Sequence, residues 1–327
     1  MTDQMIGKTF GNYEIVAQAA VGGMAVVYRA RQLNIKRDVA IKVLTSQLLA
    51  DPSFIQRFQR EVQVIARLEH PRILPVYDYG EFDGRPYIVM PYMTGGTLAE
   101  RIAEAGGHLT LEEVARLVEQ IAEGLDHAHR EGVTHRDFKP SNVLLDKSGN
   151  VYLSDFGIAK LSEDSLQLTG DRIIGTLAYM APEMFRKEPI TSAVDIYALG
   201  VTLYQLLTGS LPFEGDTAQV ISGHLHQPVP DVLAQRPDLP WEVGEVIRKA
   251  MAKEPLSRYP TAGAMAVALH TALTAPGVTQ PDLPPVETER VDLDWEPTKR
   301  AAAETQKAPQ AARAPSAPLP YTPPAPE

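Results

Sequence analysis

The sequence predicts an α+β protein made of two lobes and a tail. Apolar strand patterns with one helical pattern fill about the first 93 residues, helical patterns dominate the next part, and proline and alanine dominate the end. A chain of 327 residues is long for one domain but comfortable for two lobes. We therefore expect a small antiparallel sheet lobe with one main helix at about 10–93, a larger, mainly helical lobe at about 94–274, and a disordered tail at 275–327.

Composition and charge exclude several classes of protein. The net charge of -10 and the pI near 5.4 argue against a general nucleic-acid surface. The absence of cysteine excludes disulfides, thiolate metal sites and thiol redox chemistry. No apolar run approaches the ~20 residues that a membrane helix needs. The start, Met1-Thr-Asp-Gln, lacks a signal-peptide pattern, so we expect a cytoplasmic chain. The acidic charge leads us to expect no nucleic-acid partner.

The first lobe begins with strand patterns. Residues 10–16 predict a first strand, and residues 19–30 predict a strand, a glycine turn and a second strand. The next strand, 38–44, is apolar except for Lys42. A lysine in such a run is costly unless its ammonium group is paired, although an edge-strand lysine could instead reach solvent.

A helix with an inward-facing glutamate is expected next. Ser53–Gln56 has the form of a capping box, and Phe58, Glu61 and Ile65 recur at helical spacing. Glu61 therefore lies on the apolar stripe. A surface role is the ordinary interpretation of a glutamate, but its inward position makes it the candidate partner of Lys42.

Two helices organise the second lobe. Thr110–Glu113 is a capping signal for a helix that runs to about 130. Five apolar residues form its inward stripe: Val114, Leu117, Ile121, Leu125 and Ala128. The segment 195–207 is apolar on nearly every side, which is typical of a buried helix.

Polar side chains that suit a metal-phosphate site surround a predicted hairpin. The strands 142–145 and 151–153 flank a turn at 146–149. Asp137 and Lys139 precede this hairpin, Asn142 begins it and Asp155 follows it. Carboxylate and amide oxygens match Mg²⁺, which shares its shell with phosphates, and a lysine can neutralise a phosphoryl group in transfer.

These residues resemble a known family. The run His135-Arg-Asp-Phe-Lys-Pro-Ser-Asn142 resembles the catalytic loop of eukaryotic-type protein kinases, and Asp155-Phe-Gly157 resembles their magnesium loop. The segment 175–183 resembles the end of their activation segment, which closes with Ala-Pro-Glu. The resemblance covers about residues 10–274, is closest to bacterial serine/threonine kinases, and implies the two-lobed protein-kinase fold with ATP and Mg²⁺ as cofactors.

The resemblance implies a role for each polar residue. Asp137 would orient and deprotonate a protein Ser/Thr hydroxyl, and Lys139 would stabilise the moving phosphoryl group. Lys42 with Glu61 would hold the α- and β-phosphates. The implied metal ligands are Asn142 and Asp155.

The implied nucleotide pocket departs from the family pattern. Its expected residues are Ala20, Val21, Gly22, Gly23, Val27, Ala40, Lys42, Met90, Pro91, Met93 and Leu144. Ala20 and Ala25 replace two of the three glycines of the phosphate loop, so we expect somewhat altered ATP affinity. Pro91 stands where glutamate is common, but only its backbone carbonyl is needed.

Regulatory and structural residues are also implied. Thr169 is the first candidate phosphosite and Ser165 the second, because Arg136 beside the catalytic aspartate is typical of kinases switched by a loop phosphate. A solvated loop with no switch is the alternative. The resemblance pairs Glu183 with Arg258.

Three further implications follow from the resemblance. Asp195 would bond to the catalytic-loop backbone, and Thr176 would lie beside Lys139 in the cleft. A homodimer through the small lobe could promote autophosphorylation. The chain could be membrane-anchored if it is a piece of a longer receptor-like kinase.

Three other functions stay open at this point. A nucleotide-binding scaffold without phosphotransfer would explain Ala20 and Ala25. The tail could be the main functional part, as a ligand for phosphothreonine- or Pro-rich-binding domains, since 12 of the 27 prolines lie in the last 52 residues. Small-molecule phosphotransferases share the fold, but the Ala-Pro-Glu segment favours a protein acceptor.

Overall fold

The computed structural model describes residues 5–22, 25–45, 52–106, 108–157 and 175–274, without the side chains of 52–54 and 57. The chain divides into two units, Met1–Pro281 and Asp282–Glu327, and all described residues belong to the first. The predictions for the tail at 275–327 therefore lie outside the described residues. The predicted lobe and domain boundaries remain predictions.

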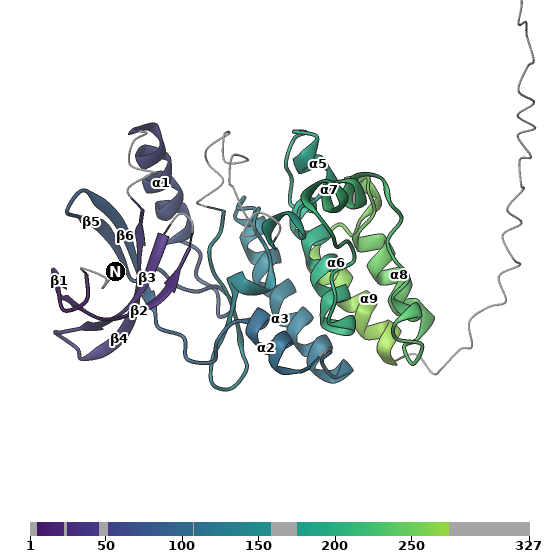
Figure 1. The fold of residues 1–327 in the computed structure, drawn as a ribbon, viewed down its shortest axis with the longest axis horizontal. Helices are drawn as coiled ribbons and strands as arrows, with labels where there is room; N and C mark the ends of the chain where they lie inside the picture. The colour runs from purple at the N-terminus through teal and green to yellow at the C-terminus, as the bar shows by residue number, and fades with distance from the viewer. Residues whose placement is uncertain (1–4, 23–24, 46–51, 107, 158–174, 275–327) are drawn as a thin grey trace, which may run out of the picture. The chain divides into compact units, whose positions relative to one another are not determined.

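The first part of the chain forms an antiparallel sheet of six strands in the order β1-β2-β3-β4-β6-β5 (Figure 1). The strands are β1 (Thr9–Phe10), β2 (Tyr13–Val21), β3 (Ala25–Gln32), β4 (Arg37–Leu44), β5 (Asp78–Phe82) and β6 (Arg85–Pro91). The prediction of one strand over 10–16 was wrong, because a turn after Phe10 folds β1 back on β2. Gly11 adopts φ 51° in this turn, a left-handed conformation that favours glycine.

The two faces of the sheet have different cores, because side chains alternate along a strand. One face buries Tyr28, Ile41 and Val89 in a cluster of its own. The other face packs against α1 (Pro52–Ile65) through Phe58 and Val62. This second face also carries Lys42, a residue of the candidate site.

The start of α1 differs from the prediction. The helix begins at Pro52, one residue before Ser53, so Ser53 lies in the first turn instead of at the N-cap. Proline is favoured in the first turn, because its fixed φ suits a helix and its missing N–H has no intrahelical partner there.

The second part of the chain is helical. Its α-helices are α2 (Leu98–Glu104), α3 (Leu111–Arg130), α5 (Pro182–Phe185), α6 (Ala193–Thr208), α7 (Thr217–His226), α8 (Trp241–Ala250) and α9 (Ala262–Thr274). Short 3-10 turns are η2 (Pro140–Asn142), η5 (Val232–Ala234) and η6 (Pro255–Ser257). A two-stranded hairpin, β7 (Val143–Leu145) with β8 (Val151–Leu153), joins this part.

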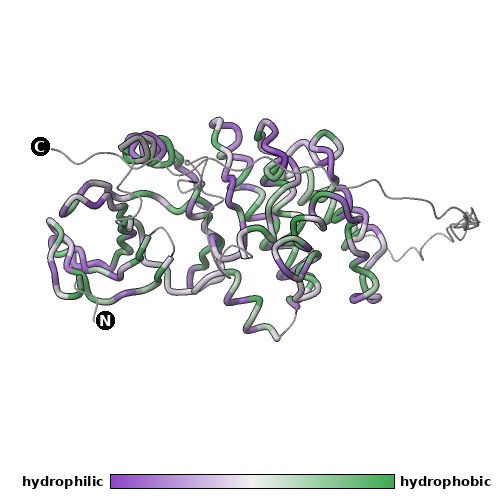
Figure 2. Tube along the Cα trace, turned by 45° about the horizontal axis from the view of Figure 1, so that its top comes forward, coloured by the Kyte–Doolittle hydropathy of each residue, from purple (hydrophilic) through white to green (hydrophobic). Residues whose placement is uncertain are grey.

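The predictions for the two main helices are confirmed. Thr110 caps α3, where its Oγ1 accepts a hydrogen bond of 3.3 Å from the backbone N–H of Glu113. The five predicted inward residues of α3 are all buried. Helix α6 is buried on nearly every side, and Figure 2 shows hydrophobic stretches through the middle of the helical part.

No helix within the described ranges has the length and apolar character that a membrane crossing requires.

Candidate active site

The hairpin of β7 and β8 brings two segments of the site together. Val143 pairs with Leu153, so the residue before β7 meets the residue after β8. The carbonyl oxygen of Asn142 accepts hydrogen bonds of 2.9 Å from both the backbone N–H and the hydroxyl of Ser154. Asn142 and Asp155 therefore lie at the same, open end of the hairpin.

Four polar side chains form a connected group at this end. Asn142 Nδ2 donates to the carbonyl oxygen of Asp137 at 2.8 Å and to its carboxylate at 3.1 Å. Lys139 Nζ lies 3.0 Å from Asp137 Oδ2 and donates to Thr176 Oγ1 at 2.9 Å. Thr176 thus lies beside Lys139, as predicted. A carboxylate that can accept a proton stands next to an ammonium group that can bind a phosphoryl oxygen.

A buried aspartate on α6 holds the catalytic loop. Asp195 is 1% exposed and accepts hydrogen bonds from the backbone N–H of His135 at 2.7 Å and of Arg136 at 2.9 Å. His129 Nε2 lies 2.7 Å from the same carboxylate. Arg136 has φ 62°, a conformation that is costly for a residue with a side chain. The hydrogen bonds from the loop backbone to Asp195 offset that cost. They are the bonds that the resemblance to protein kinases implied.

His135 is a structural residue of the site. It is fully buried, its ring stacks on Phe156 with centroids 4.5 Å apart, and Nε2 lies 2.9 Å from the carbonyl of Ser154. A carbonyl only accepts, so Nε2 carries the proton. Burial lowers the pKa of His135, which keeps the ring neutral.

Phe138 and Gly157 complete this packing. Phe138 is 2% exposed and meets the His135 ring edge-on at 5.8 Å, so it is a packing residue of the loop. A side chain at Gly157 would place its Cβ 2.9 Å from the carbonyl of His135. Only glycine allows this close approach.

In this structure Lys42 and Glu61 each lie near another residue, so the predicted pair between them stays a prediction. Lys42 Nζ pairs with Asp155 Oδ1 at 2.6 Å, whereas Glu61 Oε1 lies 4.0 Å from Arg136 Nη1. The Lys42 side chain is only 22% exposed, so its ammonium needs a partner, and Asp155 supplies one. Glu61 lies near Arg136 instead. Burial raises the pKa of Glu61, against the opposing effect of Arg136.

The ionic partner of Glu61 had no signal in the sequence. Helical periodicity correctly indicates that Glu61 lies beside the buried stripe of α1. Which cation the carboxylate meets depends on how α1 packs against the sheet and the catalytic loop.

Four of the predicted nucleotide-facing residues share one face of the sheet. Val27 pairs with Lys42 across β3 and β4, and Ala40 pairs with Met90 across β4 and β6. Opposed residues point to the same side, so these four side chains form one surface. Leu144 lies on β7, where it bridges to Thr97 after the linker between the lobes. The roles of Pro91, at the end of β6, and of Met93 remain predictions.

The phosphate-loop region is the hairpin of β2 and β3. Ala20 pairs with Val27, and the N–H of Gly22 donates to the carbonyl of Ala25 at 2.8 Å. Val21 is exposed. Gly23 lies outside the described residues.

The candidate phosphosites Ser165 and Thr169 lie outside the described residues as well. Arg136, the residue expected to bind a loop phosphate, is 42% exposed and faces Glu61. The switch therefore stays a prediction.

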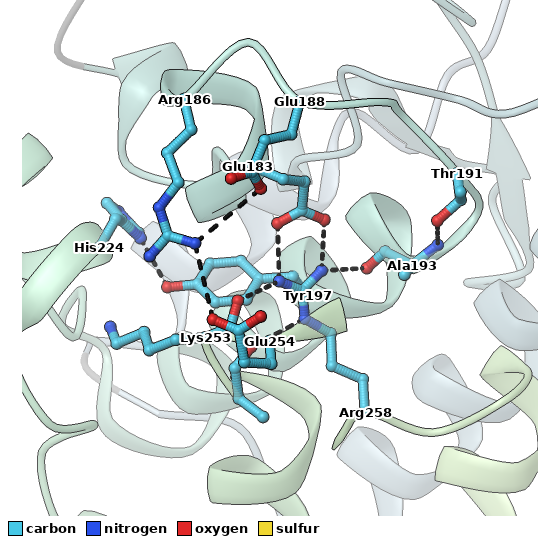
Figure 3. Close-up of polar contacts among 11 residues, drawn as sticks. Glu183, Arg186, Glu188, Thr191, Ala193, Tyr197, His224, Lys253, Glu254 and Arg258 are labelled. Carbon is cyan, nitrogen blue, oxygen red and sulfur yellow. Dashed lines mark hydrogen bonds and ion pairs between the residues drawn. The ribbon is translucent and has the colours of Figure 1, made fainter. Parts of the chain in front are cut away.

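A second polar cluster is centred on Arg258 and Glu183 (Figure 3). Arg258 donates to Glu183 through Nη1 at 2.6 Å and through Nη2 at 2.7 Å. The remaining N–H groups of Arg258 meet the carbonyls of Ala252, Lys253 and Ala193 at 2.8, 3.2 and 2.9 Å. All five donors therefore have acceptors.

Comparison with known proteins identifies the family. The model of the protein kinase domain matches residues 13–269. The chain belongs to the protein kinase family. This confirms the recognition and the two-lobed kinase fold that the sequence predicted.

The relatives are bacterial serine/threonine kinases. PrkC of Bacillus subtilis is 41% identical over 273 residues, which cover 83% of this chain and 42% of that protein. PknH of Mycobacterium bovis is 38% identical over 275 residues, covering 84% of this chain and 46% of that protein. A solved structure of the Mycobacterium tuberculosis PknI kinase domain is 34% identical, with a TM-score of 0.68, and covers 81% of this chain and 97% of that one. The chain thus spans less than half the length of the curated relatives it matches.

Proposed function

We propose that the chain is a serine/threonine protein kinase that transfers the γ-phosphate of ATP to protein hydroxyl groups. The observation that carries this proposal is the group of Asp137, Lys139, Asn142 and Thr176 at the open end of the hairpin. Family membership supports the same reaction.

Asp137 and Lys139 have different roles in phosphoryl transfer. Asp137 accepts the proton of the acceptor hydroxyl as its oxygen bonds to the γ-phosphorus and ADP leaves. Lys139 Nζ, 3.0 Å from that carboxylate, stabilises the negative charge on the transferring group. Its bond to Thr176 orients the ammonium group toward the acceptor side.

The donor set at the hairpin fits Mg²⁺. Asn142 and Asp155 supply amide and carboxylate oxygens at one end of the hairpin, and Mg²⁺ takes one or two such ligands together with phosphate oxygens. When bound, the ion would neutralise charge on the phosphates of ATP. Within the described residues, no group of three or more His, Cys, Asp or Glu side chains could hold a metal by itself, which agrees with a site completed by the nucleotide.

Nucleotide binding requires the ion pairs of the cleft to exchange. Lys42 leaves Asp155 for the α- and β-phosphates, and Glu61 leaves Arg136 for Lys42. Both existing pairs are partly solvated, so the exchange costs little. A phosphate at Thr169 or Ser165 would attract Arg136 and so favour the exchange.

The remaining functional expectations belong to this proposal. The substrates are proteins with Ser or Thr, and the chain phosphorylates its own activation loop, assisted by dimerisation through the small lobe. Autophosphorylation per molecule should then rise with protein concentration. The tail would bind phosphothreonine- or Pro-rich-binding domains, and the location is the cytoplasm or its membrane surface.

Transfer of labelled γ-phosphate from Mg-ATP tests the proposal. Wild type should label itself and a general protein substrate, and Asp137→Asn should lose about 10²–10⁴-fold in rate, the usual contribution of a general base. Asp83→Asn, in the exposed turn between β5 and β6, is the matched control and should keep full activity. Equal rates in wild type and Asp137→Asn would refute the proposal.

A nucleotide-binding scaffold without phosphotransfer is the second candidate. The pairing of Lys42 with Asp155 favours it, since it occupies two groups that catalysis needs. ATP binding without any labelling, both in the wild type and in the variant Thr169→Glu, which adds negative charge to the activation loop, would support it.

A further inference from the structure

The two alanines that replace phosphate-loop glycines lie in different environments. Ala20 is exposed on β2, whereas Ala25, the first residue of β3, is only 5% exposed. From the sequence alone, each of the two alanines adds one methyl group near the phosphates, and the two are equivalent. The structure shows that one of them is part of a hydrophobic core.

The register of the sheet places Ala25 on the nucleotide face, at its hairpin end. Ala25 pairs with Leu44, and two residues further along each strand Val27 pairs with Lys42. The carbonyl of Ala25 accepts the N–H of Gly22 at 2.8 Å, which closes the hairpin. Ala25 therefore lies between the tip of the hairpin and Lys42.

The methyl group of Ala25 belongs to the cluster that holds α1. This cluster contains Leu44 and Ile88 from the sheet and Phe58 and Val62 from α1. Phe58 is 2% exposed and Val62 is fully buried. The hairpin and the helix therefore share one packed core, in which even one methylene group affects the fit.

Glu61 directly precedes Val62 on α1. Any movement of Val62 within the cluster moves the Glu61 backbone with it. Glycine at position 25 would remove the methyl group from the cluster and would add backbone freedom beside the hairpin tip.

We propose that Ala25 is a positioning residue, whose methyl group couples the phosphate hairpin to α1 and hence to Glu61. This inference rests on the proposed kinase function. The hairpin that covers the phosphates and the helix that carries the lysine's catalytic partner would move as one body. A family glycine at this position would uncouple them.

The central variant is Ala25→Gly, with Ala19→Gly, on the exposed part of β2, as its matched control. Ala25→Gly should raise the KM for ATP by about threefold to tenfold, since burial of one methyl group corresponds to a factor of about four. The kcat should stay within about twofold, because no reacting group changes. Ala19→Gly removes an exposed methyl group outside the predicted nucleotide pocket and should leave both constants unchanged.

A double-mutant cycle separates coupling from simple loss of packing. In a Val62→Ala background the coupling through α1 is already weakened, so Ala25→Gly should add little to the KM. In a background of Val246→Ala, a buried change in α8, its full effect should persist. Additive effects with Val62→Ala would overturn the proposal.

Hydrogen exchange provides a readout that needs no activity. Amides of 55–65 on α1 should exchange faster in Ala25→Gly than in wild type or Ala19→Gly, while those of α6 stay unchanged. Unchanged exchange on α1, or an unchanged or lowered KM, overturns the proposal.

The two proposals fail in different ways. If the wild type binds Mg-ATP but transfers no phosphate, the proposed kinase function fails. The dissociation constant for Mg-ATP then replaces the KM, and together with hydrogen exchange it still decides whether Ala25 couples the hairpin to α1.

Discussion

Two ionic clusters of the protein contrast with each other. Arg258 and Glu183 have side chains 0% and 2% exposed and bond through two short contacts (Figure 3). In the cleft, Lys42 and Asp155 are 22% and 37% exposed, and the more distant pair of Arg136 and Glu61 is 42% and 33% exposed.

The difference shows how one kind of interaction serves two purposes. A buried arginine with every donor satisfied has one arrangement, because breaking any bond leaves an unpaired charge in the core. Half-exposed pairs retain water as an alternative partner, so their charges can exchange at small cost. The first cluster keeps the large lobe together, and the second is able to rearrange around a nucleotide.

The largest expected effect comes from the cleft. Lys42→Met should reduce phosphoryl transfer by about 10²–10³-fold, the usual effect of removing one preorganised charge contact. The free energy of unfolding should change by less than about 1 kcal/mol, since the lost pair is partly solvated. Kinetics and urea unfolding of the same preparation measure both. A large loss of stability in Lys42→Met would contradict the difference proposed between the two ionic clusters.

Arg258→Met should have the opposite profile. It leaves Glu183 buried without its partner and should destabilise the protein by about 3–5 kcal/mol. Arg29→Met is the matched control, because Arg29 pairs with Asp38 on the surface and its loss should cost less than about 1 kcal/mol. Urea midpoints compare the two variants, and equal midpoints would contradict the prediction.

The buried side chain of His224 should make the stability of the folded protein sensitive to acid. Burial lowers its pKa to about 4, and its Nδ1 lies 2.8 Å from the hydroxyl of Tyr197. The unfolded chain binds a proton near pH 6.5 and the folded one only near 4, so stability is lost as the pH falls through this range, by on the order of 2–3 kcal/mol.

The variant His224→Gln should remove this part of the acid sensitivity, as unfolding measured between pH 4 and 7.5 would show. His226→Gln, an exposed change on the same helix, should retain the wild-type pH profile. Identical slopes for both variants would exclude His224 as the source.

The smallest effect on stability is expected at Glu61. Its pKa is raised by burial, so the folded state favours the protonated form more than the unfolded state does. Stability is therefore lost as the pH rises from the ordinary glutamate value through the raised one. Glu61→Gln removes this loss and should be at least as stable as wild type at pH 8, although it should transfer phosphate more slowly. Lower stability of the variant at pH 8 would mean that its ion pair with Arg136 dominates.

Local pattern was sufficient for much of the molecule. The apolar stripe of α3, its Thr110 cap and the hairpin that follows Asn142 can be predicted from spacings of two and of three to four residues, which are properties of neighbouring positions in the chain. The run from His135 to Asn142 was enough to recognise the family, because its chemistry is contained in one loop.

The tertiary structure decided the rest. The partner of Lys42 is Asp155, 113 positions away. The choice between the carboxylates of Glu61 and Asp155 depends on how α1 and the segment after β8 pack against the sheet. The sequence also could not show that the methyl group of Ala25 packs with α1 while that of Ala20 faces solvent. Periodicity states which side of an element is apolar, but the packing of distant elements determines what that side meets.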